Sequence, residues 1–168
     1  MKVIYLYFSG LLLLLVTISA AKCADVTITI NGKVVAMPCT VSTPTANIDL
    51  GTLESSDFVT AGSASTWKTF TLNLTNCPIG TSAVTATFSG TSDSSASYFS
   101  NTGGAQNMAI QLADANGNNI TNGGTQTVSV SDSSQSAVFN LEVRAISTQG
   151  KATQGSIQSI INVIYTYS

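Results

Sequence analysis

The sequence predicts an all-β sandwich, and two features predict it. Short segments with an apolar residue at every second position recur along the chain, and turn signals separate them. No segment shows a sustained helical period. Charged residues make up only 8% of the chain, so solubility depends on Ser, Thr, Asn and Gln. We therefore expect one domain of two antiparallel sheets. Its uncharged surface would have a smaller desolvation penalty than a charged one when it is buried in an assembly.

The first 23 residues have the pattern of a secretory signal peptide. A short basic start precedes the apolar run 11–18, which is too short for a membrane span. We place the cleavage after Cys23, so that the mature chain begins at Ala24. A cut after Ala21 is the alternative, and it would leave Cys23 as an unpaired thiol. Lys22 argues against a lipoprotein signal, because such signals have a small residue just before the cysteine.

The mature chain opens with ADVTITINGKVVAMPC at residues 24–39. Val26, Ile28 and Ile30 share one face of the expected strand, and an Asn-Gly dipeptide follows at 31–32. Two interpretations fit this pattern. The dipeptide is a strong signal for a local hairpin, which residues 34–35 would continue. Alternatively, the strand leaves its own domain and completes a neighbouring one. Periodicity alone does not choose between them.

Further strand patterns follow along the mature chain. Alternating apolar residues predict strands at 69–74, 84–88, 108–112, 128–130 and 139–145. Asn116-Gly117 predicts a turn, and the segment 89–106, rich in Ser, Gly and Asn, predicts a surface loop. Short strands at this spacing are typical of a sandwich of the immunoglobulin kind.

The C-terminal segment 157–167 predicts a strand with apolar residues on both faces. Ile161 and Val163 lie on one face, and Ile160 and Ile164 lie on the other. This pattern is typical of a central, buried strand. No residues remain to form the next strand, and an exposed apolar edge promotes aggregation. One end of the chain therefore has an extra strand, and the other end lacks one.

The remaining residues limit the chemistry. Residues 24–168 carry four basic and eight acidic side chains, which is a poor composition for nucleic-acid binding. The sequence has no histidine, no Walker loop and no zinc-binding spacing, and Asp49 and Glu54 have no local partner. We expect no catalytic residue, no metal and no cofactor. Asp132 is interpreted as a turn residue, Trp67 as a core or strand-edge residue, and Arg144 as one member of a surface pair.

Two cysteines, Cys39 and Cys77, follow the signal peptide. An even cysteine count in an exported chain predicts one disulfide. In the chain-entropy model such a bond stabilises the fold by about 4 kcal/mol.

Four segments carry a resemblance to a known family. They are ADVTITINGKVVAMPCTVST at 24–43, LTNCP at 74–78, DSSQSAVF at 132–139 and NVIYTYS at 162–168. A penultimate aromatic residue, Tyr167, also matches the family pattern, as does a glycine fourteenth from the end. Together these segments resemble the chaperone–usher pilins, and most of all the minor tip subunits of type 1 fimbriae.

The resemblance implies an incomplete immunoglobulin-like sandwich that lacks its last strand. It implies a signal peptide at 1–23, an N-terminal donor-strand extension at 24–37 and a pilin domain at 38–168. The implied donor residues are Val26, Ile28, Ile30, Gly32 and Val34. The residues implied for the acceptor groove and the chaperone contact are Gly155, Ile161, Val163, Tyr165, Tyr167 and Ser168. The resemblance implies that the donor strand of one subunit pairs with the acceptor groove of another by β-strand addition.

The expected function is that of a structural minor subunit, a tip adaptor, in a type 1-like adhesive fimbria. The implied partners are neighbouring fimbrial subunits, including a tip adhesin or another adaptor, together with a periplasmic chaperone and an outer-membrane usher. The expected location is the cell-surface fimbrium, reached through the periplasm. The alternatives are a major rod pilin of the same family and a self-complete secreted sandwich that binds sugar or protein.

Overall fold

The computed structural model describes residues 28–35 and 37–168. The expected signal peptide at 1–23 and the donor residue Val26 lie outside the described residues. The chain falls into two units, divided between Lys33 and Val34. The larger unit, Val34–Ser168, contains all the strands that the structure describes.

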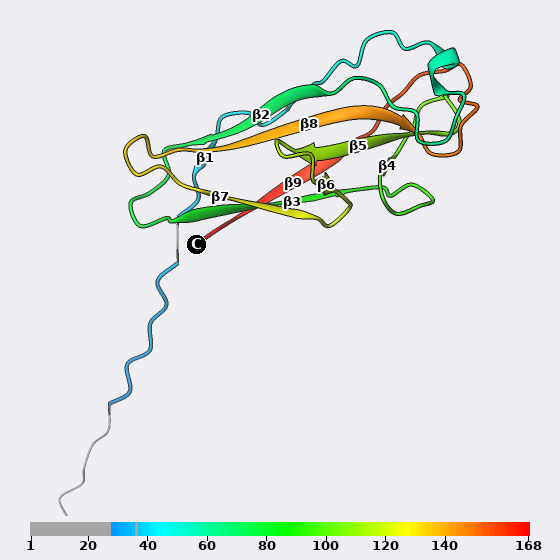
Figure 1. Ribbon diagram of the computed structural model, residues 1–168. Helices are drawn as coiled ribbons and strands as arrows, with labels where there is room; N and C mark the ends of the chain where they lie inside the picture. Colours follow the sequence, from blue (N-terminus) through cyan, green and yellow to red (C-terminus); the bar gives the residue numbers. More distant parts are fainter. Residues whose placement is uncertain (1–27, 36) are drawn as a thin grey trace, which may run out of the picture. The chain divides into compact units, whose positions relative to one another are not determined.

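The larger unit consists of two antiparallel sheets that pack as layers (Figure 1). The first sheet has the order β1-β2-β8-β5-β4, with β6 paired to β5. The second sheet has the order β7-β3-β9. The bounds are β1 Thr40–Val41, β2 Lys68–Thr75, β3 Ala83–Gly90, β4 Phe99–Ser100, β5 Met108–Asp114, β6 Asn119–Ile120, β7 Thr125–Ser129, β8 Ala137–Ser147 and β9 Ile161–Tyr167. A 3₁₀ turn, η1, spans Ser55–Phe58. The prediction of an all-β sandwich is confirmed.

The core lies between the two sheets and follows the predicted alternation. In the β2–β8 pair, Leu72 lies opposite Phe139 and both side chains are buried. The next pair along the strands, Thr71 and Asn140, is exposed on the outer face of the sheet. Because side chains alternate between the faces of a strand, one apolar residue in two is enough to fill the core.

The disulfide between Cys39 and Cys77 is present. Cys39 directly precedes β1 and Cys77 follows β2, and both side chains are buried. The bond therefore fastens the beginning of the folded unit to the far end of its second strand.

The segment 89–106 differs from the surface loop that its composition predicts. It contains β4, in which Phe99 is fully buried and pairs with Ile110 of β5. The prediction is wrong here because β4 is only two residues long, too short to show a period of two. Its polar neighbours then dominate the composition of the segment.

The structure assigns no strand to residues 28–35. The local hairpin therefore has no paired strands among the residues described. The side chains of Ile28 and Ile30 are exposed by 78% and 89%. Over residues 28–35 and 37–168, no helix is long and apolar enough to cross a membrane.

Candidate functional site

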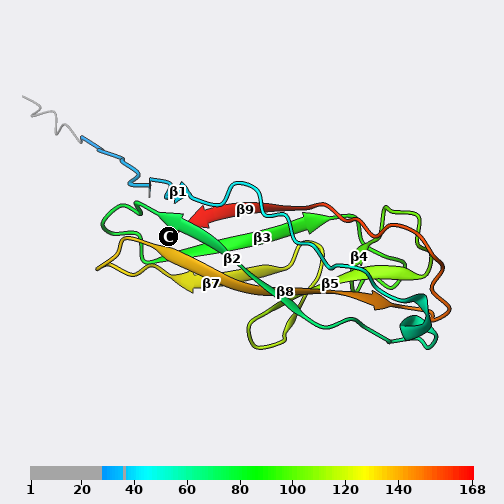
Figure 2. The ribbon, with the colours of Figure 1, turned by 90° about the horizontal axis from the view of Figure 1, so that it is seen from above.

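Strand β9 lies at an edge of the second sheet (Figure 2). It pairs with β3 in antiparallel register, with Val163 opposite Phe88. Among the described residues no strand pairs with its other side. The place beside the C-terminal strand, which the sequence predicts to lack a strand, is therefore unfilled among the described residues. Ile160 and Ile164, which would be covered in a central strand, are exposed by 68% and 62%.

The inward face of β9 is only half covered. Its inward residues pack against the core yet stay half-buried; they are Ile161, Val163, Tyr165 and Tyr167, and we call these four the open strip. Their partners across the sheet behave differently, because Val84, Ala86 and Phe88 of β3 are at most 1% exposed. The core is therefore closed over β3 and open along the free side of β9.

The open strip has apolar neighbours in the opposite layer. Phe70 of β2 and Leu50, which precedes η1, are also half-buried against the same core. The ring of Tyr165 packs on Phe139 of β8, with ring centroids 5.7 Å apart. Burial raises the pKa of the Tyr165 phenol, and the charge of Tyr167 raises it further. The strip therefore presents a neutral, apolar surface at physiological pH.

Gly155 lies outside the open strip, in the segment that leads into β9. Its backbone has φ +152°, and a Cβ at this position would collide with the backbone of Gly104 and Ala105. A glycine is required here because two chain segments approach closely. Gly155 thus allows the segment that precedes the strip in the sequence to pack closely against residues 104–105.

Ser168 follows the open strip at the end of the chain. Its backbone oxygen accepts hydrogen bonds from the N–H groups of Ser82 and Ala83, at 2.7 and 3.1 Å. The Ser82 hydroxyl donates to the same oxygen at 3.0 Å. Sequence reasoning missed Ser82, since a serine in a turn between strands carries no signal for this contact.

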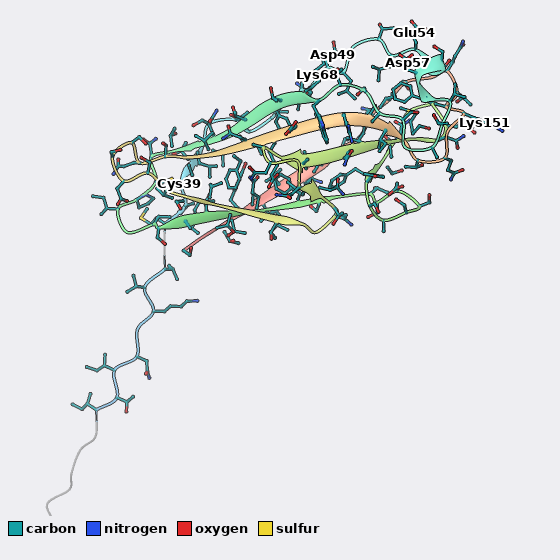
Figure 3. The ribbon with its side chains drawn as sticks, viewed as in Figure 1. Cys39, Asp49, Glu54, Asp57, Lys68 and Lys151 are labelled. Carbon is teal, nitrogen blue, oxygen red and sulfur yellow. A yellow bond between two sulfur atoms is a disulfide. The ribbon has the colours of Figure 1, made fainter. Side chains whose placement is uncertain are left out.

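Among the residues that the structure describes, the charged side chains form no second site. Glu54 and Asp57 are exposed at η1, and Asp49 is exposed on the segment that leads to it, near Lys68 in the view of Figure 3. No group of three or more His, Cys, Asp or Glu side chains could hold a metal within the described part of the chain. The Arg144 guanidinium lies 4.2 Å from the ring centroid of Trp67 and also donates to Gln111. Arg144 thus pairs with an aromatic ring and an amide.

Comparison with known proteins identifies the family. The family described as fimbrial protein matches residues 28–168. The chain belongs to the fimbrial protein family. FimG of Escherichia coli K12 is 57% identical to this fimbrial protein over 88% of the chain and 87% of FimG. The fimbrial-like protein YdeR of the same organism is 47% identical over 87% of each chain.

A solved structure supports the same fold. A subunit in the structure of a chaperone–usher pilus superposes with a TM-score of 0.66 and 23% identity, and covers 87% of this chain and 97% of its own. The chain is thus a fimbrial subunit exported to the cell-surface fimbrium, and it has the fold of a chaperone–usher pilus subunit. It assembles with other fimbrial subunits, and its similarity to FimG supports a minor tip-adaptor subunit.

Proposed function

We propose that this fimbrial subunit links two neighbours by strand exchange, accepting a strand along β9 and donating residues 24–37. The observation that carries the proposal is the open strip, because the residues that face the core on β9 are only half-buried. The unpaired side of β9 offers N–H and C=O groups to an added strand. Strand addition would satisfy these groups and cover the strip together.

On the acceptor side, the strip would provide the apolar contacts and β9 the backbone hydrogen bonds. Gly155 would mark the start of the site and Ser168 its end. Each ladder hydrogen bond contributes a net of about 1 kcal/mol. The pockets between the strip residues would select the alternating side chains of the incoming strand.

On the donor side, the alternation of residues 24–37 fits such an acceptor. Val26, Ile28, Ile30, Gly32 and Val34 share one face of an extended chain. Burying the four larger side chains contributes about 6–12 kcal/mol as an upper estimate. The glycine would lie where a pocket is shallow or a backbone comes close.

Before assembly, a periplasmic chaperone would lend a strand to β9 and hold the terminal carboxylate of Ser168. An outer-membrane usher would then exchange this strand for the extension of the next subunit. The role is structural and requires no catalysis, in keeping with a family of structural fimbrial subunits.

The donor role is tested by replacing Ile30 with Asp. A carboxylate in an apolar pocket loses the burial energy and adds a desolvation penalty, so we expect binding to the neighbouring subunit to weaken by about 100-fold or more. Thr29→Asp is the matched control, since residue 29 lies on the opposite face of the strand, and its binding stays within about threefold of the wild type.

The measurement is incorporation into fimbriae and affinity for the purified neighbouring subunit. The melting temperature of the variant's own domain should not change. Equal loss with Ile30→Asp and Thr29→Asp, or unfolding of the domain by Ile30→Asp alone, would contradict the donor role.

A further inference from the structure

The segment that leads into β9 has few supports of its own. Residues 154–160 belong to no helix or strand. Among the residues described, every hydrogen bond of this segment goes to residues 101–105. The contacts involve only two of its residues, Ser156 and Gln158. The segment is therefore positioned by one loop, the loop that follows β4.

Asn101 is the centre of that loop, because its side chain makes four hydrogen bonds. Its amide nitrogen donates to the backbone oxygens of Ala105, at 2.7 Å, and Ser156, at 3.4 Å. Its amide oxygen accepts from the N–H groups of Gly103, at 2.9 Å, and Gln158, at 2.8 Å. Two of these bonds shape the loop and two hold the incoming segment, so one side chain couples both.

Backbone N–H groups of residues that follow Asn101 also bind the segment, and we call these contacts together with those of Asn101 the clamp. The N–H of Thr102 donates to the oxygen of Gln158 at 2.8 Å, and the N–H of Ala105 donates to the oxygen of Ser156 at 3.0 Å. The close approach of Gly155 to the loop backbone allows these bonds to form. A shift of the loop would therefore displace the segment directly before the open strip.

Ile157 lies between Ser156 and Gln158, so the hydrogen bonds of these two residues fix the position of its apolar side chain. It is half-buried and packs against both core clusters of the unit. Together with Gly155, Phe58 and Leu53 it lines a hollow beside η1. The place of Ile157 thus sets the shape of the core where the strip begins.

We propose that Asn101 is a positioning residue of the strand-acceptor site. It holds Ile157 and the entry to β9 in the shape that an incoming strand must meet. This inference rests on the proposed acceptor function. Because the segment has no other hydrogen-bonded support, loss of the clamp leaves it mobile before a strand binds. The added strand covers and orders it afterwards, so the clamp governs capture more than release.

Asn101→Asp tests this directly, because it keeps the size and the accepting oxygen but loses both amide donors. Asn119→Asp is the matched control, since Asn119 donates only to Ser97 and has no contact with the β9 lead-in. The probe is a synthetic peptide with the sequence of the N-terminal extension of the next subunit, the counterpart in that subunit of residues 24–37 here. Its association and dissociation rates are measured with the mature chain, together with amide hydrogen exchange of Thr102 and Ala105.

In Asn101→Asp, two backbone oxygens lose a donor and face a carboxylate, so exchange at Thr102 and Ala105 should rise about tenfold and peptide association should slow about tenfold. Dissociation should change less than twofold, and Asn119→Asp should leave both rates unchanged. A purely structural effect would speed dissociation and raise exchange throughout β3 and β9, and that result overturns the proposal.

Unchanged association in Asn101→Asp also overturns the proposal. A wild-type chain that binds no peptide refutes the acceptor function itself, which separates the two failures. If Asn101→Asp does not fold, Asn101→Ser replaces it, because serine keeps one hydrogen-bonding group. This variant should also slow peptide association and leave dissociation nearly unchanged.

Discussion

At the scale of single residues, Gly155 shows that the reason for a glycine at a position can be hidden from its sequence context. Its place fourteenth from the end matches a family pattern, but the pattern gives no reason for a glycine. The reason is the approach of the loop backbone at Gly104 and Ala105, which leaves no room for a Cβ.

Gly155→Ala should lower the free energy of unfolding by about 3 kcal/mol or more, because a methyl group would collide with backbone that cannot move independently. Gly117→Ala is the control: Gly117 has φ +80° but no atom within 4 Å of the added Cβ, so only about 1–2 kcal/mol is expected. Urea denaturation of both variants measures the difference. Equal losses would show that the close approach has no energetic weight.

Tyr165, a residue of the open strip, makes the stability of the fold depend on pH in the alkaline range. Its pKa is raised above 10.0 by burial and by Tyr167, so the folded protein holds the phenolic proton more tightly than the unfolded chain does. This contribution to stability is complete below pH 10.0 and is lost as the pH rises from there through the folded-state pKa.

Tyr165→Phe should therefore lose less stability than the wild type when the pH is raised above 10.0, the ordinary pKa of the phenol. Urea midpoints on both sides of that pH provide the measurement. An identical alkaline decline in the two proteins would show that Tyr165 is not the group responsible.

Some residues of the site could be predicted from sequence and others could not. Ile161, Val163, Tyr165 and Tyr167 share one face because a strand alternates its side chains, and the structure brings them together. Asn101 and the C-terminal contact of Ser82 escaped prediction. The hydrogen bonds from Asn101 to residues 156 and 158, and from Ser82 to Ser168, each span more than 50 positions, and such bonds leave no periodic trace in the sequence.

At the scale of elements, β9 is the most informative strand, because its two apolar faces and the missing next strand together predict an unfilled place beside it. Apolar residues on both faces predict a strand between two neighbours, but β9 has only β3 beside it in the described residues. A complemented subunit would give β9 a second neighbour, so the pattern agrees with the proposed assembled state. The prediction of a surface loop at 89–106 missed the short strand β4, because two residues cannot show an alternating pattern.

The disulfide fastens two elements that are far apart in sequence, with 38 positions between Cys39 and Cys77. Replacing both cysteines with alanine should lower the free energy of unfolding by about 4 kcal/mol, because the unfolded chain regains the entropy of an open loop. Urea denaturation under oxidising conditions measures this loss. The same stability with and without the cysteines would refute the bond's contribution.

At the scale of the whole molecule, the domain has a core that is closed on one side and open on the other. The fold class, the disulfide and the alternation of the core strands could all be predicted, because they depend on local patterns and on cysteine count. The edge position of β9 could not be read from the alternation alone, because the same pattern fits a complete sheet.

The thermal stability of the mature chain, residues 24–168, with and without a peptide of the next subunit's N-terminal extension tests the central claim most directly. An added strand would bury the open strip and supply about 6–12 kcal/mol at most, so the melting temperature should rise by about 20 °C or more. A monomer that melts at high temperature alone, and whose melting temperature the peptide leaves unchanged, would contradict the account.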